Sequence, residues 1–399
     1  MKAYIPYGAY WSTPFARWQG EFAHLHSIEF AAHVTRDELA KRGISAEAFD
    51  YAAYGITVMQ NRSFYGLPWF TALTGAEHLP GPTVSQACAT GARLLATAAG
   101  EFMTGTAKTA LLVSGDRTSN GPHVYYPAPE GPGGTGASEN VVLDSFNVDP
   151  FARCAMVDTA DNVARREGIE TAEQHELALH RYAQYADALK DDRAFQRRYM
   201  AAEFAVPDAR FRKTIKTVAG DCGVYPASAD KMAALKPVRE GGSVTFAAQT
   251  HPADGNAGIV MTADPGFASE LSPRSGAPKI EVISFGQARV EKAHMPAAPI
   301  DAARNALSFA GLDIGEMKVI KSHNPFAVND IAFARAFSID WKSMNNFGCS
   351  LIWGHPQGPT GLRAIIEMIE ELETKGGGYG LFQGCAAGDS VMAVIVRVA

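Results

Sequence analysis

The chain has 399 residues, of which 47% are hydrophobic and 20% charged, and its formal net charge is −6. This length and composition are typical of a globular protein with two or three domains and a large core. The acidic balance argues against nucleic acid as a partner, because nucleic-acid-binding proteins carry a basic surplus on one face. The sequence has no run of about 18 apolar residues, so we expect no membrane span.

The cysteine content and the first residues indicate the compartment. The five cysteines are scattered and never form a CxxC pair, which argues against a disulfide framework and a structural zinc site. Residues 1–18 contain early prolines and polar residues instead of the continuous apolar stretch of a signal peptide. We therefore expect a cytoplasmic protein with reduced thiols and no metal centre.

The first part of the chain alternates helices with short apolar strands. Residues 27–44 form an amphipathic pattern that Gly43 ends, and residues 51–58 are typical of a strand. A helix is predicted over residues 91–102, and a buried strand over residues 110–115. This alternation predicts an α/β fold with a mostly parallel sheet.

Residues 116–242 have a different character. Two polar helices, over residues 158–169 and 172–189, follow a glycine-rich stretch at 131–140, which we interpret as a loop rather than a dinucleotide-binding motif. We expect an inserted loop domain that lies over a site. Its basic residues would either meet phosphates or form a solvated face. They are Arg193, Arg197, Arg198, Arg210, Arg212, Lys213 and Lys216.

The strand and helix pattern returns after Ser243. Strands are predicted over residues 279–289, 316–327 and 389–399, and helices over 301–312, 330–337 and 359–378. Their order resembles that of the first half, which indicates a duplicated α/β unit. We therefore expect three parts: an N-terminal half of residues 1–115 plus 243–272, the inserted domain of residues 116–242, and a C-terminal half of residues 273–399.

Cys88 lies where a predicted strand turns into a helix, in the stretch VSQACATGARLL. Small neighbours allow close approach of a substrate, and a helix N-terminus is expected to lower the pKa of the thiol and favour a nucleophilic thiolate. A buried structural cysteine is the alternative.

Three other reactive residues occupy similar junctions. His355 lies between Gly354 and Pro356 before a long helix, Cys385 lies in a small-residue turn before the last strand, and His323 ends a strand. Open α/β sheets place their active sites at such junctions. A histidine can activate a thiol, and a second thiol can exchange a proton at carbon.

With these motifs the sequence resembles the thiolase family over nearly its whole length. Each motif alone is weak, but their order along the chain is specific. They are VSQACATGARLL (84–95), AMVDTADNVARREGI (155–169), AALKPVREGGSVTFAAQTHPADGNAG (233–258), SHNPFAVND (322–330), GHPQGPTGLR (354–363) and GCAAGDSVMAV (384–394). The resemblance implies the thiolase fold, with a duplicated core in α-β-α-β-α layers and an inserted loop domain, residues 116–242, that binds coenzyme A (CoA).

The resemblance also implies a role for each reactive residue. Cys88 would carry the acyl group as a thioester, and His355 would activate it. Cys385 would move the α-proton, and His323 would help to bind the thioester oxygen. The backbone amides of Cys88 and Ala387 would form an oxyanion hole, for which Ala387 replaces the usual glycine.

Several positions depart from the family pattern. Asn324 replaces a glutamate, Thr250 stands where a CoA-contacting serine is common, and Trp353 replaces a small aliphatic residue. We expect these three residues and Arg212 to contact substrate or CoA in a remodelled pocket.

The opening residues and the HNPF motif are similar to those of the thiolase subunit of (S)-2-benzoylsuccinyl-CoA thiolases of anaerobic toluene degradation. This implies cleavage by CoA into benzoyl-CoA and succinyl-CoA, no permanently bound cofactor, at least a homodimer, and a small companion subunit with a zinc-binding segment and an OB fold. The alternatives are an acetyl-CoA acyltransferase or 3-ketoacyl-CoA thiolase of another pathway, or a non-catalytic scaffold that binds acyl-CoA. A ketoacyl synthase would pair its cysteine with two histidines, and Cys385 argues against it.

Overall fold

The strands of the two halves join in one 11-stranded sheet. The computed structural model describes residues 2–119 and 121–399. The N-terminal half supplies β1 (Tyr4–Ile5), β2 (Tyr10–Ser12), β3 (Ala16–Arg17), β4 (Tyr51–Gly55), β5 (Thr83–Val84), β6 (Thr109–Arg117) and β11 (Ala253–Thr262). The C-terminal half supplies β12 (Ile280–Arg289), β13 (Met317–His323), β14 (Gly378–Ala386) and β15 (Ser390–Val398).

The order of pairing reveals the internal duplication. In the N-terminal half β4 is parallel to β6, and β6 is antiparallel to β11. In the C-terminal half β13 is parallel to β14, and β14 is antiparallel to β15. The short strand β1 pairs with both β11 and β12 and so joins the two halves edge to edge. The predicted duplicated α/β fold is therefore confirmed. The expectation of a mostly parallel sheet is wrong, because β11, β12 and β15 each pair with their neighbours in the antiparallel direction.

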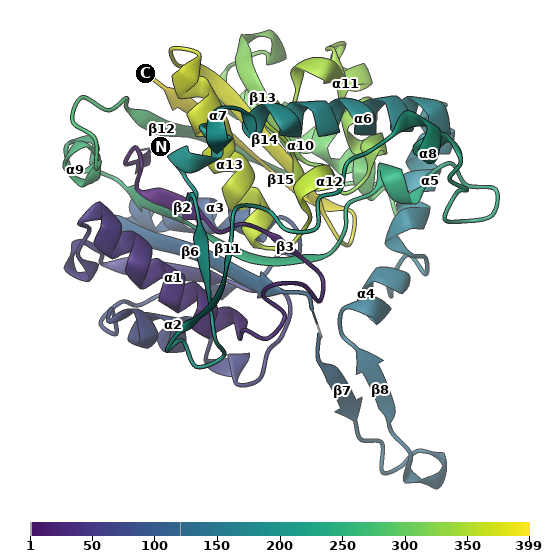
Figure 1. Ribbon diagram of the computed structural model, residues 1–399, viewed down its shortest axis with the longest axis horizontal. Helices are drawn as coiled ribbons and strands as arrows, with labels where there is room; N and C mark the ends of the chain where they lie inside the picture. The colour runs from purple at the N-terminus through teal and green to yellow at the C-terminus, as the bar shows by residue number, and fades with distance from the viewer. Residues whose placement is uncertain (1, 120) are drawn as a thin grey trace.

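Helices cover the strands in layers, as Figure 1 shows. The outer face of the N-terminal strands is covered by α1 (Ser27–Arg42) and α2 (Leu67–Thr74), and that of the C-terminal strands by α10 (Ala298–Ala310). Between the two sets of strands lie α3 (Thr90–Thr104) and α13 (Pro359–Thr374).

Alternation along the strands explains these layers. In β6, Leu112 packs with the central helices while Leu111 packs with the outer ones. In β14, Phe382 faces the centre and Leu381 faces α10. Because successive side chains of a strand point to opposite faces, continuous apolar strands need helices on both sides.

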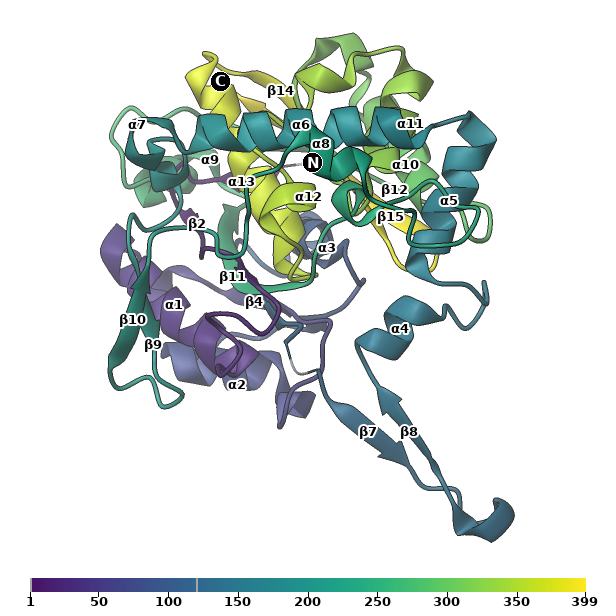
Figure 2. The same cartoon turned by 45° about the vertical axis from the view of Figure 1, so that its right-hand side comes forward.

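The segment between β6 and β11 adds no named strand to the large sheet. A hairpin of β7 (His123–Tyr126) and β8 (Ala137–Asn140) projects from the body of the protein (Figure 2). The segment also forms α4 (Leu143–Asn147), α5 (Met156–Glu167), α6 (Thr171–Ala188), α7 (Lys190–Arg193), the β9 (Phe204–Pro207) and β10 (Thr214–Val218) hairpin, and α8 (Ala229–Ala233). The glycine-rich stretch lies at the tip of the first hairpin and in β8, as expected for a loop and not for a dinucleotide-binding turn.

Of the remaining helices, α9 (Pro265–Leu271) packs against β11 and β1, whereas α11 (Ala327–Phe337) and α12 (Ser350–Trp353) lie beside the C-terminal strands. Within the described ranges, none of the helices combines the length and the apolar character that crossing a membrane requires.

Candidate active site

Cys88 lies in a tight turn between β5 and α3. The preceding residue, Ala87, has a φ of +43°, a left-handed conformation that costs a residue with a Cβ about 1–3 kcal/mol. Thr90 holds this turn, because its amide and hydroxyl donate to the carbonyl oxygen of Ala87 at 3.1 and 2.7 Å. The turn therefore fixes the direction in which the Cys88 side chain leaves the backbone.

His355 faces this thiol. Its Nε2 lies 3.1 Å from the Cys88 Sγ, and its Nδ1 lies 2.7 Å from the Thr360 hydroxyl. The backbone is fixed as well, since the His355 amide donates to the His251 carbonyl and its own carbonyl accepts from the Ala253 amide. The thiol and the imidazole, predicted as nucleophile and base, are thus within hydrogen-bond reach of each other.

The two residues meet because α3 and α13 touch backbone to backbone. A Cβ added to Gly91 would lie 2.6 Å from the Leu362 amide nitrogen and 2.8 Å from the Gly358 carbonyl oxygen. Only glycine permits this approach. The contact places the start of α3, next to Cys88, against the start of α13, just after His355.

His323 lies beside His355 at the end of β13. The two rings stack with their centroids 4.0 Å apart and their planes at 25°. The His323 Nδ1 lies 2.8 Å from the Ser350 hydroxyl, whereas its buried Nε2 has no hydrogen-bond partner among the described residues. One nitrogen of each imidazole and the Cys88 Sγ lie within 4.8 Å of one another.

Cys385 and Ala387 complete the group. Cys385 lies in β14, one residue before its end, so the expectation that it lies in the turn itself is wrong by two residues. Its fully buried sulfur accepts a hydrogen bond of 3.3 Å from the Asn329 amide. Burial raises the pKa of Cys385, and the nearby Cys88 raises it further. The Ala387 backbone amide lowers the pKa of Cys88, whose burial has the larger and opposite effect.

Burial controls the protonation of the group. It raises the pKa of Cys88 to about 12, against the smaller lowering by the backbone amides of Ala387 and Cys88 itself. The expectation that the helix N-terminus lowers this pKa is therefore wrong, because desolvation of the thiolate outweighs the helix dipole. Burial lowers the pKa of His355 to about 3, which keeps the imidazole neutral. The resting pair is a thiol and a neutral base.

Three of the predicted substrate contacts lie near this group but make contacts within the protein. Asn324 is fully buried and donates to Asp330 and Cys349. The Thr250 hydroxyl donates to the Ser350 carbonyl oxygen at 2.5 Å. Trp353 is also fully buried and lies under the Arg363 guanidinium, 4.4 Å from its carbon to the ring centroid. These contacts within the protein do not show that Asn324, Thr250 or Trp353 binds substrate or CoA, so that role stays a prediction.

The structure does not bring Arg212 into the group around Cys88. Arg212 lines a surface groove of about 310 Å³ between α1 and the β9–β10 hairpin. Figure 2 shows this helix and this hairpin side by side. Other members of the basic cluster are paired with acidic residues, such as Arg198 with Glu370 and Glu373. A phosphate role for this cluster stays a prediction.

Two polar residues of the site were missed by the sequence reasoning. Gln357 accepts a hydrogen bond of 3.3 Å from the Cys88 thiol through its Oε1. Asp116 is buried at the end of β6 and accepts from the amides of Thr57, Val58 and Gly358. Burial raises the pKa of Asp116 to about 7, against the lowering by these donors. The available signal was a glutamine within the GHPQG turn.

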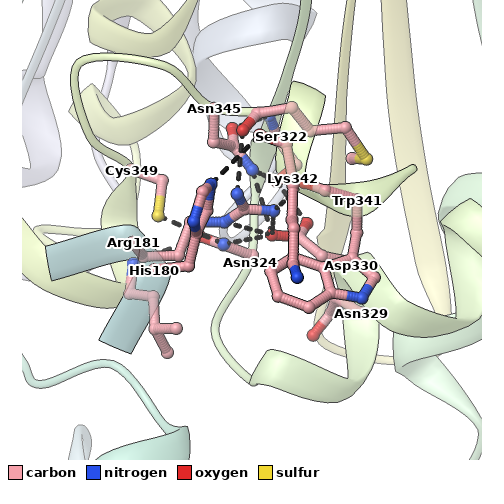
Figure 3. Close-up of polar contacts among 12 residues, drawn as sticks. His180, Arg181, Ser322, Asn324, Asn329, Asp330, Trp341, Lys342, Asn345 and Cys349 are labelled. Atoms are coloured by element: carbon pink, nitrogen blue, oxygen red, sulfur yellow. Dashed lines mark hydrogen bonds and ion pairs between the residues drawn. The ribbon is translucent and has the colours of Figure 1, made fainter. Parts of the chain in front are cut away.

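A buried ion pair between Arg181 and Asp330 lies next to the strand end that carries His323. The Asp330 carboxylate accepts from Arg181 at 3.0 Å, and both side chains are fully buried. Figure 3 shows that Asn324, Asn345 and Ser322 also point to this carboxylate. Because Arg181 belongs to α6, the pair ties the segment between β6 and β11 to the strand end that carries His323.

Comparison with known proteins agrees with this architecture. The family description "Thiolase, N-terminal domain" matches residues 9–264, and "Thiolase, C-terminal domain" matches residues 277–398. Beta-ketothiolase BktB of Cupriavidus necator is 27% identical over 389 residues, which cover 96% of each chain. Acetyl-CoA acetyltransferase of Escherichia coli is 25% identical over 396 residues, again with 96% of each chain covered.

Solved structures share the fold. Human mitochondrial 3-ketoacyl-CoA thiolase superposes with a TM-score of 0.90 at 21% identity, covering 100% of this chain and 99% of the other. The same human enzyme in complex with CoA gives a TM-score of 0.88 at 22% identity, covering 100% and 98%. On the match of both family descriptions along its length, the chain belongs to the thiolase family of acyltransferases, enzymes that use CoA as a substrate and need no permanently bound cofactor.

Proposed function

We propose that the chain is an active thiolase that cleaves a β-ketoacyl-CoA through an acyl-enzyme on Cys88. The observation that carries this proposal is the 3.1 Å contact between the Cys88 Sγ and the His355 Nε2, beside a second thiol at Cys385. A non-catalytic scaffold has no need of a thiol, a neutral base and a second thiol in one group.

In the first half-reaction, the Cys88 thiol gives its proton to the His355 Nε2 and the sulfur attacks the β-keto carbon. The Cα–Cβ bond breaks, and its electron pair takes a proton from the Cys385 thiol at Cα. This releases the CoA ester that carries Cα and leaves the β-acyl group as a thioester on Cys88. General-base help is necessary, because burial keeps the thiol protonated at neutral pH.

In the second half-reaction, CoA gives its thiol proton to the Cys385 thiolate and its sulfur attacks the Cys88 thioester. The new acyl-CoA leaves, and the Cys88 sulfur recovers its proton from His355. The oxygen that gains charge in both half-reactions would lie against the backbone amides of Cys88 and Ala387. Support comes from the pKa of Cys88, which burial raises and the backbone amides of Ala387 and of Cys88 itself lower. Preorganised donors of this kind stabilise a developing oxyanion. His323 would act on the oxygen of the second acyl-CoA, directly or through water.

We propose (S)-2-benzoylsuccinyl-CoA as the substrate, with benzoyl-CoA and succinyl-CoA as products, in anaerobic toluene degradation. The aromatic opening residues and the HNPF motif support this choice. Gln357, which adds a polar side chain beside the nucleophile, also fits a substrate with a polar substituent. The names of the relatives favour a second candidate, an acetyl-CoA acyltransferase or 3-ketoacyl-CoA thiolase of another pathway.

The assembly we propose is a cytoplasmic homodimer that works with a small zinc-binding OB-fold subunit. The N-terminal sheet edge, β5, is available for a second copy, and the nearby Phe64 and Tyr65 are 94% and 67% exposed. Unpaired strand edges and exposed aromatic residues favour association. Light scattering of the chain, alone and with the companion, tests this arrangement.

The decisive experiment combines turnover with detection of the acyl-enzyme. Thiolysis of a panel of β-ketoacyl-CoAs, with and without the companion, identifies the substrate. Intact mass spectrometry should detect an acyl adduct on the wild-type chain and none on Cys88→Ser. Cys385→Ala should lose α-proton exchange while Cys88 remains open to acylation. An acyl adduct on Cys88→Ser would rule out Cys88 as the acyl carrier, whereas CoA binding without any turnover would favour the non-catalytic scaffold.

A further inference from the structure

The His323 side chain carries a nitrogen that the mechanism uses only indirectly. Its Nε2 is fully buried, has no hydrogen-bond partner among the described residues, and belongs to the group with Cys88 and His355. A buried polar atom without a partner costs about 1–3 kcal/mol. This nitrogen is therefore a candidate atom for binding a ligand.

The hydrogen bonds behind His323 decide whether this nitrogen donates or accepts. The Ser350 hydroxyl donates its single proton to the Asn324 Oδ1 at 3.1 Å, so it accepts from the His323 Nδ1–H at 2.8 Å. The Asn324 amide is held in this orientation because its nitrogen donates to the Asp330 carboxylate at 2.7 Å. Figure 3 shows this anchoring contact. The His323 Nε2 thus presents a lone pair to the site.

A hydroxyl group also holds His355 in place. Its Nδ1 lies 2.7 Å from the Thr360 hydroxyl, and its Nε2 faces the Cys88 sulfur at 3.1 Å. Metal-binding histidines in proteins are oriented by a hydrogen bond from the other ring nitrogen to an oxygen acceptor, and the two hydroxyl groups are in position to serve in this way. Two neutral imidazoles and one thiol in a single cluster are a ligand set that suits Zn²⁺.

We propose that Zn²⁺ binds to the Cys88 sulfur and the Nε2 atoms of His323 and His355, and that it reversibly blocks the nucleophile. The metal displaces the thiol proton, which leaves to solvent, so that a Zn–S bond replaces the S–H bond and nothing is oxidised. The fourth coordination position is open to water. This inference goes beyond the proposed function and does not depend on it.

The distances permit such a site after a small adjustment. Tetrahedral zinc with bonds of about 2.3 Å to sulfur and about 2.0–2.1 Å to nitrogen separates its ligand atoms by about 3.4–3.6 Å. The Sγ–Nε2 distance of 3.1 Å and the 4.8 Å limit for the whole set bracket this value. The cation also supplies the positive charge that a buried thiolate lacks in the free protein.

The experiment measures binding directly on the chelator-treated, reduced chain, without turnover. Co²⁺ serves as the coloured probe, and a thiolate-to-cobalt absorption band together with intense visible bands reports a tetrahedral Cys/His site. We expect one Zn²⁺ per chain by dialysis and elemental analysis, displacement of Co²⁺ by Zn²⁺, and at least a tenfold slower alkylation of Cys88 by iodoacetamide.

Four variants test the ligand assignment. Cys88→Ser should lose the thiolate band, and His323→Asn and His355→Asn should each weaken Zn²⁺ binding at least tenfold. The matched control is Cys154→Ser, which removes another partly exposed thiol, near Asp149 and Asp158, and should bind like the wild type.

Unchanged Zn²⁺ binding in Cys88→Ser or His323→Asn would overturn the proposal, and so would loss of binding in Cys154→Ser. An absence of stoichiometric Zn²⁺ on the wild-type chain would overturn it as well. Because no arm uses catalysis, a chain that binds Zn²⁺ but never forms an acyl adduct would refute the proposed function alone.

Discussion

Gly91→Ala should separate the two central helices and, with them, the nucleophile from its base. The new Cβ would lie 2.6 Å from the Leu362 nitrogen, 2.8 Å from the Gly358 oxygen and 3.0 Å from the Gly361 Cα. All three atoms are backbone atoms, so no side chain can rotate away. An ordinary contact needs about 3.5 Å, and the helices must therefore part by about 0.5–1 Å.

The expected energy follows from two opposing effects. Overpacking a close contact costs about 1–3 kcal/mol, whereas replacing a helical glycine by alanine gains about 0.5–1 kcal/mol. Gly100 offers a matched control, since it is exposed in the same helix, α3, and a Cβ there meets nothing within 4 Å. The difference in unfolding free energy between the two variants isolates the overpacking cost.

Denaturant unfolding and thiolysis kinetics together test the reasoning. Gly100→Ala should be slightly stabilised and keep its kcat/KM. Gly91→Ala should be less stable than Gly100→Ala by about 1–3 kcal/mol, and a displacement near 1 Å should lower kcat/KM by about 100-fold. If Gly91→Ala matched Gly100→Ala in both measurements, the close contact between the helices could not be what aligns Cys88 with His355.

Three further changes have defined outcomes. Asp330→Asn should lower the unfolding free energy by about 3–5 kcal/mol, because it leaves Arg181 buried without a counter-charge. The control Asp301→Asn breaks an exposed ion pair and should lower it by less than about 1 kcal/mol. Equal losses of unfolding free energy in the two variants would contradict this reasoning. Gln357→Leu removes the acceptor of the thiol hydrogen bond and should slow acylation about fivefold, measured by quenched-flow mass spectrometry, while an unchanged rate would show that the bond has no kinetic role. Burial lowers the pKa of His355 to about 3 from its usual 6.5, so the neutral imidazole favours the folded state fully above about pH 6.5, and this contribution is lost as the pH falls toward 3. The unfolding free energy of the wild type should therefore fall more steeply with decreasing pH than that of His355→Asn, by up to about 1.4 kcal/mol per pH unit. Parallel stability curves of the two proteins between pH 4 and 6 would exclude this.

Local sequence signals determined much of the secondary structure. The helix α1 ends at Arg42 because Gly43 adopts the left-handed conformation that closes a helix, with a φ of 66°. The alternation of strands and helices indicated the α/β class. Strands that are apolar at every position need helices on both faces of the sheet. The small strands β1–β3 escaped notice, since two or three residues are too few to show a period.

The sequence by itself also named Cys88, His323, His355 and Cys385 as reactive, because cysteine and histidine in turns of small residues are exposed to a ligand. Only the tertiary structure brought Cys88 to His355, which lies 267 residues away in the chain. That distance depends on the packing of α3 against α13, and a contact of this kind has no local signature. Burial, which reverses the expected pKa of Cys88, is likewise a property of everything packed around the sulfur, not of its neighbours in sequence.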